Sequence, residues 1–346
     1  MTALLVAGVF SFLAAIFGMP ILMRFLAARG IGQPIRKDGP QAHLKKSGTP
    51  TMGGLAIIGA IVVGYVVPHW VTNAVPFSKG GLLALFALVG TGAVGLADDW
   101  IKVTRKRSLG LNKRAKITGQ CTVAIIFAER AVNWANLKMV VGFTRFSWPG
   151  WKLPPLLWVI FAVIIVIGFS NAVNLTDGLD GLAAGTSMYA SAAYCVMAFW
   201  MFRHKSVYQV PQALDIAVLT GAMVGACAGF LWWNAAPARI FMGDVGALGL
   251  GAGFGAVALI TYTPLLLPLL GGMFVIETLS VIIQVFTFRC MNKRRLFRMA
   301  PIHHHFELGG WPETTVIVRF WILAMIMVSV GLGIFYNDFI RLGGID

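Results

Sequence analysis

Residues 154–173 read PPLLWVIFAVIIVIGFSNAV, and residues 174–181, which follow at once, read NLTDGLDG. The first stretch has the length of roughly 20 apolar residues that a helix needs to cross about 30 Å of hydrocarbon. The second holds an amide, a hydroxyl and two carboxylates within seven residues. Glycines beside Asp177 and Asp180 allow close approach of the backbone to a ligand. We therefore predict a transmembrane helix that delivers a polar functional loop to one membrane surface.

Similar apolar runs occupy most of the chain. The composition is 58% hydrophobic and 12% charged, whereas a soluble domain carries about 25% charged residues. We expect one domain over residues 1–346, an all-α polytopic integral membrane protein with about ten transmembrane helices. Residues 245–287 are nearly continuous and favour two helices joined by a tight turn, although one broken helix is also compatible with them. The predicted spans are 3–23, 53–72, 81–99, 117–134, 154–173, 181–202, 213–233, 245–262, 264–287 and 318–337.

The charge distribution predicts the orientation of these spans. The net charge is +15, and most of the 28 lysines and arginines lie in the loops 24–52, 100–116 and 288–317. Basic loops mark the cytoplasmic side of a membrane protein, so this excess does not indicate nucleic-acid binding. Both termini should lie on the outer side, and the absence of a basic segment before the first span argues against a signal peptide. The four cysteines show no metal-ligand spacing and read as small core residues.

The acidic residues are concentrated at the predicted inner surface. Five of the thirteen lie in three motifs at the edges of apolar runs: Asp98-Asp99, Asp177 with Asp180, and Asp244. Carboxylates at a membrane boundary are costly and are usually functional. Successive helical residues point about 100° apart, so we expect Asp98 and Asp99 not to bind one ion together. Asp177 and Asp180 would share a face if their turn were helical, and Asp244 has the alternative role of a helix N-cap.

Two further motifs lie on the same predicted side. Residues 46–54 read KSGTPTMGG, and residues 301–307 read PIHHHFE. A structural zinc site would need additional ligands that the sequence does not provide near the histidines, so phosphate binding or a plain solvated loop fits them better. Phe241 offers a face for stacking on a base. Glu277 lies inside an apolar span, where a carboxylate is either functional or bonded to a neighbouring helix.

These motifs resemble the phospho-N-acetylmuramoyl-pentapeptide-transferase family of the polyprenyl-phosphate N-acetylhexosamine-1-phosphate transferase superfamily, over essentially the whole chain. The paired aspartates, the segment 174–181 and Gly243-Asp244 look like superfamily features. The segment 48–54 and the three histidines look specific to the muramoyl branch.

The resemblance implies roles for individual residues. Asp244 matches the Mg²⁺ ligand, and Asp98 and Asp99 match the catalytic pair, with Asp98 the base on the lipid phosphate. His303 is expected in the catalytic group as well. The matching substrate-binding positions are Lys46, Thr51, Lys116, Asn174, Asp177, Asp180, Asn234, Phe241, Gly243, His304 and His305.

The resemblance also implies the reaction. Phospho-MurNAc-pentapeptide passes from UDP-MurNAc-pentapeptide to undecaprenyl phosphate, which gives lipid I and UMP, the first membrane step of peptidoglycan synthesis. The expected enzyme is Mg²⁺-dependent, homodimeric, in contact with membrane lipid and located in the bacterial inner membrane, with its active site facing the cytoplasm. Direct attack by the lipid phosphate and a covalent aspartyl intermediate both remain open. A UDP-GlcNAc transferase and a transporter are the rival interpretations, and the transporter should place its site at the midplane.

Overall fold

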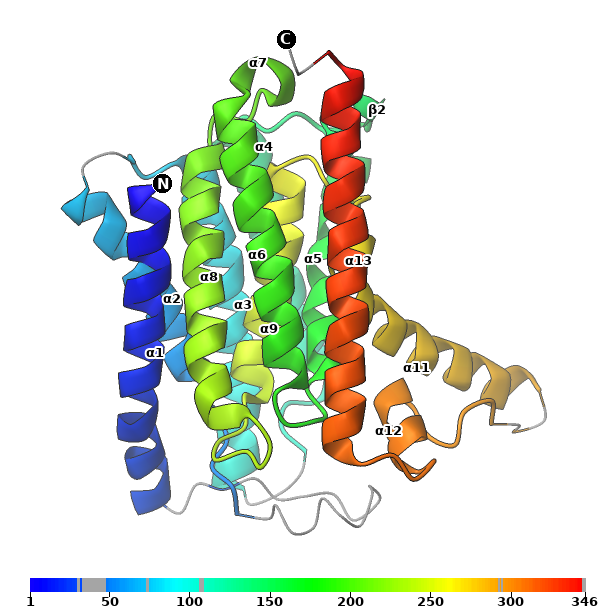
Figure 1. The fold of residues 1–346 in the computed structure, drawn as a ribbon. Helices are drawn as coiled ribbons and strands as arrows, with labels where there is room; N and C mark the ends of the chain where they lie inside the picture. Colours follow the sequence, from blue (N-terminus) through cyan, green and yellow to red (C-terminus); the bar gives the residue numbers. More distant parts are fainter. Residues whose placement is uncertain are drawn as a thin grey trace.

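The computed structural model describes residues 1–29, 32, 48–72, 75–105, 109–291, 293 and 295–343. Within them the regular elements are helices, apart from one short hairpin, and turns and loops connect them (Figure 1). In chain order the elements are α1 (Thr2–Ala28), α2 (Gly54–Val71), α3 (Lys79–Thr104), α4 (Lys113–Asn133), β1 (Val140–Arg145), β2 (Trp148–Lys152), α5 (Pro155–Thr176), α6 (Leu182–Arg203), α7 (Lys205–Tyr208), α8 (Ala213–Asn234), α9 (Gly243–Ile260), α10 (Leu267–Leu270), α11 (Gly272–Cys290), α12 (Ile302–Glu307) and α13 (Glu313–Arg341).

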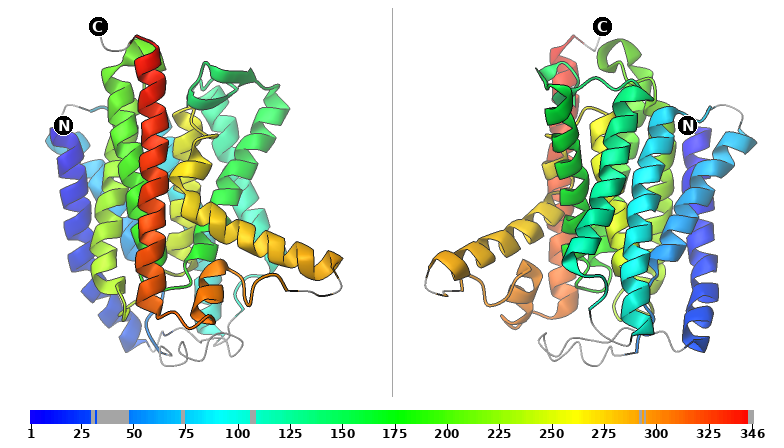
Figure 2. Two further views of the ribbon diagram at one scale, coloured as in Figure 1. Left: turned by 45° about the vertical axis from the view of Figure 1, so that its right-hand side comes forward. Right: turned by 180° about the vertical axis from the view of Figure 1, so that it is seen from behind.

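The predicted membrane class is confirmed. Nine helices among the described residues are long and apolar enough to cross a membrane. The predicted span 117–134 corresponds to α4, which has 21 residues but carries Lys113, Arg114 and Lys116 at its start and Glu129 and Arg130 near its end. It nevertheless packs in the bundle beside α3 and α5 (Figure 2). The chain is therefore an all-α, multi-pass membrane protein, with α4 as the most polar of its long helices.

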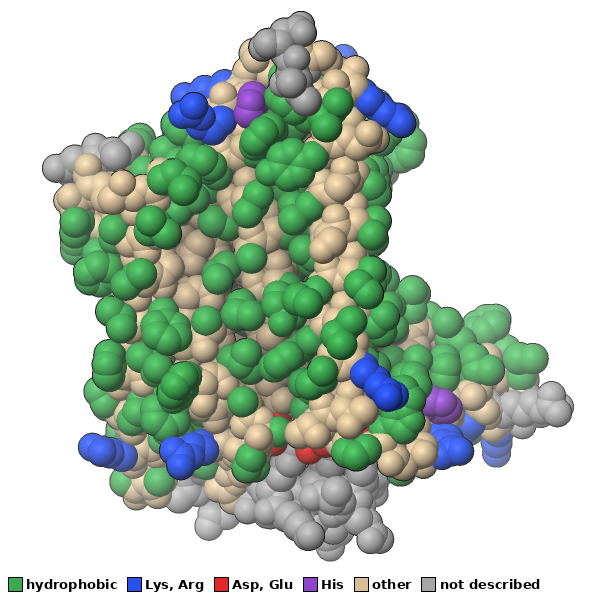
Figure 3. All heavy atoms as spheres, in the orientation of Figure 1, with side chains coloured by type: hydrophobic (Ala, Val, Ile, Leu, Met, Phe, Trp, Pro, Cys, Tyr) green, Lys and Arg blue, Asp and Glu red, His purple; other side chains and the backbone are tan. Residues whose placement is uncertain are grey.

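The surface of the bundle matches a bilayer. Apolar side chains cover its flank, and lysines and arginines gather near the two ends (Figure 3). Large side chains such as Phe17, Ile21 and Ile164 are more than half exposed, which would be unfavourable in water but is favourable in hydrocarbon. The acidic side chains visible in this view lie at the end opposite the C-terminus.

Helix α9 lies at the centre of the bundle. It is almost wholly buried, and its neighbours are α3 on one side and α5 on another. Small residues at membrane helix interfaces let backbones approach closely, and α9 contains Gly246, Gly249, Gly251, Gly253 and Gly255. Its first turn meets the last turns of α3 and α5, so the local packing brings three distant segments of sequence together.

Both chain termini lie at the end of the bundle opposite these turns (Figure 1). This arrangement agrees with an even number of crossings. The hairpin β1–β2, whose strands pair Val140 with Lys152, lies at the same end as the C-terminus. The hairpin is anchored to α13 because Arg145 Nε lies 3.0 Å from Asp338 Oδ2, a contact between residues too distant in sequence to be anticipated.

The segment 245–287 forms separate helices joined by a turn, as predicted, but its second part is divided into α10 and α11, and α11 departs from the bundle. The turn after Thr261 leads into α10, which ends at Leu270, and α11 begins at Gly272. Helix α11 then leans strongly away from the other helices (Figures 1 and 2). Its outer half exposes Ile282 and Phe286. The chain therefore bends at Gly271, where α10 ends and α11 begins, and α12 lies beneath the leaning helix (Figure 1).

Candidate active site

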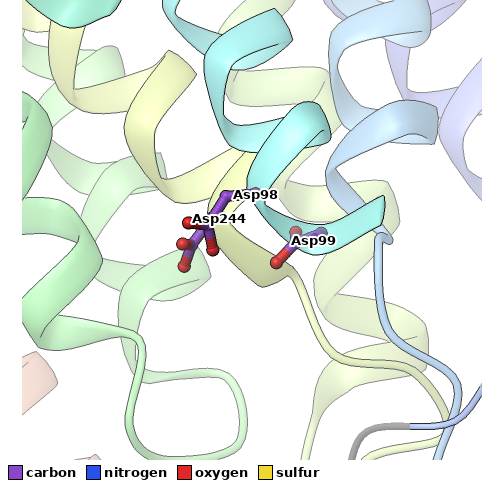
Figure 4. Close-up of side chains that lie close together, drawn as sticks. All are labelled: Asp98, Asp99 and Asp244. Carbon is purple, nitrogen blue, oxygen red and sulfur yellow. The ribbon is translucent and has the colours of Figure 1, made fainter. Parts of the chain in front are cut away.

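Three predicted carboxylates converge at one end of the bundle. Asp98 and Asp99 come from the last part of α3, and Asp244 comes from the first turn of α9 (Figure 4). One oxygen from each lies within 4.8 Å of the others. The approach requires a glycine, since a Cβ on Gly95 would lie 2.2 Å from the Asp244 carbonyl oxygen. A bulkier residue at position 95 would separate α3 from α9 and disperse the carboxylates.

Lys102 joins the three carboxylates. Its Nζ lies 2.7 Å from Asp98 Oδ2, and 3.0 Å from both Asp99 Oδ1 and Asp244 Oδ2. The sequence led us to expect that Asp98 and Asp99 would not serve one ion, because they are adjacent on a helix. That expectation concerns a bound metal ion and stays a prediction, but both carboxylates do contact one ammonium group. Lys102 stands three and four residues further along the same face, so both side chains reach it. The cation at the centre of the cluster is thus part of the chain itself.

The second oxygen of each carboxylate is held by another donor. The amide of Leu111 donates to Asp98 Oδ1 at 2.9 Å, and the amide of Val245 donates to Asp99 Oδ2 at 3.2 Å. Asn174 Nδ2 donates to Asp244 Oδ1 at 2.8 Å. Buried carboxylates need such partners. The three groups therefore present a fixed arrangement rather than a mobile acidic patch.

Asp244 has the most partners of the three. Besides Lys102 and Asn174, it accepts a bond of 2.6 Å from Lys116 Nζ on α4. The N-cap position of α9 is Met242, and Asp244 lies inside the first turn, so the alternative role of a structural N-cap does not describe it. Four helices, α3, α4, α5 and α9, meet through this one carboxylate. The predictions that placed Lys116 and Asn174 in a common site with Asp244 agree with the geometry.

Asp98, Asp99 and Asp244 together form what is called the acidic centre below. Asp177, which follows the last residue of α5, lies beside it. It accepts a hydrogen bond from the backbone of Gly243, which has a φ of 73°. Burial of the carboxyl group and the nearby charges of Asp244 and Asp99 raise the pKa of Asp177 well above its usual range. A Cβ on Gly243 would lie 3.1 Å from Thr51 Oγ1, so the segment after residue 48 also reaches the site. A carboxyl with a raised pKa beside other carboxylates is typical of a functional site.

Asp180 points to a different segment. Its carboxylate accepts from the Ala238 amide at 2.9 Å, and its own amide donates to Glu313 Oε1 at 3.1 Å. The turn after α5 is not helical, so Asp177 and Asp180 do not share a face as a helical turn would require. Asp177 faces the acidic centre, whereas Asp180 orders the loop between α8 and α9.

Asn234 and Phe241 bracket that loop. The Asn234 amide donates to the Ile240 carbonyl at 2.8 Å and accepts from the Gly181 amide at 2.9 Å. It thereby joins the loops 177–181 and 235–242, which is a positioning task. Phe241 is half-buried, and its backbone bonds to Pro50 at 2.9 Å. Its ring keeps the partial exposure that stacking on a base would require.

The three histidines diverge on α12. His303 is fully buried with its Nδ1 at 3.0 Å from Glu277 Oε1. His304 Nδ1 lies 2.7 Å from Glu307 Oε2, and His305 Nδ1 accepts from the Arg298 amide at 3.1 Å. Each ring thus has its own partner. This arrangement agrees with the argument that they do not bind one zinc ion together.

Three residues outside the predicted set of site residues, Lys102, Glu277 and Glu313, contact members of that set. Lys46 lies outside the described residues. From the sequence, Lys102 fits both an ion pair with Asp98, four residues earlier on a helix, and one of several basic residues that could hold diphosphate. Only the tertiary contact with Asp244 distinguishes it. Glu313 gave no signal in the sequence. Glu277 was left open between two roles, and its pairing with His303 gives it a place beside the site.

The donor set is compatible with a divalent cation. Carboxylate oxygens are the ligands that Mg²⁺ prefers, and Asp98, Asp99 and Asp244 offer three of them close together. Two lysines against three carboxylates leave the cluster with one formal negative charge. The same lysines give it affinity for phosphate oxygens. The arrangement therefore suits the joint binding of a metal ion and a diphosphate at a membrane surface.

Comparison with known proteins gives a consistent result. Residues 81–262 match the model of glycosyl transferase family 4, and residues 46–58 match phospho-N-acetylmuramoyl-pentapeptide-transferase signature 1. A phospho-N-acetylmuramoyl-pentapeptide-transferase of Corynebacterium aurimucosum is 47% identical over 100% of this chain and 99% of its own length. Its counterparts in Frankia casuarinae and Streptomyces griseus are 48% and 45% identical, over 99% and 97% of this chain and 100% and 98% of their own lengths.

Proposed function

Because the chain belongs to the phospho-N-acetylmuramoyl-pentapeptide-transferase family, we propose that it transfers phospho-MurNAc-pentapeptide from UDP-MurNAc-pentapeptide to undecaprenyl phosphate. The products are lipid I and UMP. The observation that carries the proposal is the cluster of Asp98, Asp99 and Asp244 around Lys102 at the end of a multi-pass bundle. A site at this depth lets a water-soluble nucleotide meet a phosphate on a membrane-bound chain.

Mg²⁺ is the proposed cofactor, held by Asp244. When bound, it supplies charge neutralisation for the diphosphate and for the leaving UMP. Lys102 and Lys116 each contact Asp244 and are partly exposed, so they have the reach to bind phosphate oxygens. Most of the catalytic effect in phosphoryl transfer comes from such positioning and electrostatic stabilisation.

The proposed nucleophile is the lipid phosphate, and the proposed base is Asp98. A phosphate oxygen is already a competent nucleophile, which favours direct attack on the β-phosphate over a covalent aspartyl intermediate. Asp98 and Asp99 both have one oxygen bonded to a backbone amide and the other to Lys102. Those contacts suit an electrostatic or proton-accepting role better than the approach of an aspartate to phosphorus.

The uridine is proposed to lie beside the loop 235–242. Phe241 would stack on the base, with Lys46 and Asp180 as neighbouring contacts, and Thr51 and Gly243 lie between this loop and the acidic centre. Stacking of a base on an aromatic ring contributes about 1–3 kcal/mol. The half-buried position of Phe241 and its backbone bond to Pro50 support a rigid platform at this place.

The donor is tested by measuring UMP release from the purified protein with undecaprenyl phosphate and Mg²⁺. We expect turnover with UDP-MurNAc-pentapeptide and none with UDP-GlcNAc. Turnover of UDP-GlcNAc alone would place the chain in the sister branch of the superfamily. Absence of turnover with either donor, in protein that retains its thermal transition, would reopen the transporter interpretation.

The proposed location is the bacterial inner membrane with the acidic centre on the cytoplasmic side. Lys152 on β2 and Leu308 after α12 are exposed near opposite ends of the bundle. In a cysteine-free background, we expect Lys152→Cys to react with an impermeant maleimide added to intact spheroplasts. Leu308→Cys should react only after the membrane is permeabilised. The reverse pattern would invert the proposed orientation.

A further inference from the structure

The contact between Glu277 and His303 joins two elements that are outside the acidic centre. Glu277 lies on α11 and His303 on α12, and both side chains are fully buried. His303 Nδ1 lies 3.0 Å from Glu277 Oε1. An ionised carboxylate accepts hydrogen bonds but does not donate them, so with Glu277 ionised the imidazole donates through Nδ1. The other ring nitrogen, Nε2, is then left for a different partner.

That second nitrogen has no hydrogen-bond partner among the described residues. The Nε2 atom faces Gly178, since a Cβ built on Gly178 would lie 2.3 Å from it. Buried polar atoms are almost always bonded, and an orphaned one calls for an explanation. Gly178 follows Asp177, which contacts Gly243 and interacts electrostatically with Asp244. The working nitrogen of His303 is thus directed at the loop that borders the acidic centre.

The surroundings of His303 single out Glu277 as its positioning partner. The neighbouring ring of His304 lies 4.1 Å away between centroids and is itself bonded to Glu307. The remaining oxygen of Glu277, Oε2, has no partner among the described residues either. A buried carboxylate that devotes one oxygen to a histidine is the arrangement that orients an imidazole and fixes its tautomer.

We propose that Glu277 is a positioning residue that holds His303 with Nδ1 as donor and directs Nε2 at Gly178, so that the imidazole sets the position of the loop that carries Asp177 beside the acidic centre. This inference rests on the proposed function. It assigns a task to the leaning helix α11, which carries Glu277 from the bundle to the histidine segment. It also explains a glycine at position 178, because a side chain there would displace the imidazole.

The test is a double-mutant cycle on the rate of UMP release from UDP-MurNAc-pentapeptide. Glu277→Gln and His303→Gln should each lower kcat by about 10–100-fold, the range for partners that orient a working histidine. The double variant should be no slower than the slower single variant, because Glu277 acts through His303. Gly178→Ala should lower kcat in the same range. A purely structural role for Glu277 would instead give losses that multiply.

Matched controls distinguish a loss of kcat caused by a misplaced His303 from one caused by misfolding. Glu307→Gln alters the neighbouring glutamate–histidine pair, and its effect should multiply with that of His303→Gln. Thermal midpoints in detergent show whether any variant fails to fold, and Glu277→Asp, which keeps the carboxylate, should recover part of the lost rate. If the wild-type protein is active and the losses of kcat from Glu277→Gln and His303→Gln multiply in the double variant, only this inference is overturned. An inactive, folded wild type overturns the proposed function itself.

Discussion

Replacement of Asp244 by Asn is expected to lower the rate of transfer by about 10³-fold or more. Asp244 is the carboxylate to which Lys102, Lys116 and Asn174 all bond, and it is the proposed principal ligand of Mg²⁺. Loss of a single group that stabilises charge in a transition state typically costs 10²–10³-fold, and here the change also weakens metal binding. Initial rates of UMP release at saturating UDP-MurNAc-pentapeptide measure the effect.

Asp215 provides a matched control for this variant. It is also a buried aspartate in the first turn of a helix, and it accepts bonds from Tyr65 and the Ser78 amide at the opposite end of the bundle. Asp215→Asn should lower the thermal midpoint while the folded protein keeps its kcat. Equal losses of kcat in the two variants would show that the effect of Asp244→Asn is one of general folding.

Replacement of Lys102 by Gln is expected to make stability depend on divalent cations. The ammonium lies within 3.0 Å of all three carboxylates, and its side chain is only 25% exposed. Removal of one partner from a buried charge cluster typically costs about 3–5 kcal/mol. The thermal midpoint in EDTA should therefore fall, and Mg²⁺ or Mn²⁺ should restore part of it because a divalent cation replaces the missing positive charge. Transfer activity should fall as well, by about 10²-fold.

The matched control is Lys113→Gln, which removes an exposed lysine at the start of α4. Its thermal midpoint should change little, since exposed charges contribute about 0–1 kcal/mol. If Lys102→Gln and Lys113→Gln have the same midpoint in EDTA, the three carboxylates do not depend on the central ammonium.

The spans and the convergence of the polar motifs were predictable because both follow from local patterns. Apolar length marks a membrane helix, and the basic loops placed all five motifs on one side. That placement predicts that several polar residues meet in the structure, as they do: Asp98, Asp99, Lys116, Asn174 and Asp244. It also argues against the transporter alternative, since the acidic centre lies where α3 ends and α9 begins, at an end of the bundle rather than at the midplane.

Contacts between distant elements were not predictable from local patterns. The role of Lys102 depends on the approach of α9 to α3 at Gly95, and the pairing of Glu277 with His303 depends on the lean of α11. The divergence of Asp177 and Asp180 depends on a turn that is not helical. The predicted homodimer and the individual roles of Asp98 and Asp99 stay predictions.

The most direct test of the acidic centre is to locate the metal itself. We would determine the structure of the protein with Mn²⁺ and UDP and measure the anomalous scattering of manganese. We expect an anomalous peak at coordination distance from the Asp244 carboxylate and from a phosphate oxygen of UDP. We expect this peak to be absent in Asp244→Asn. A manganese peak bound to phosphate but remote from Asp98, Asp99 and Asp244 would contradict the central claim that these carboxylates form the transfer site.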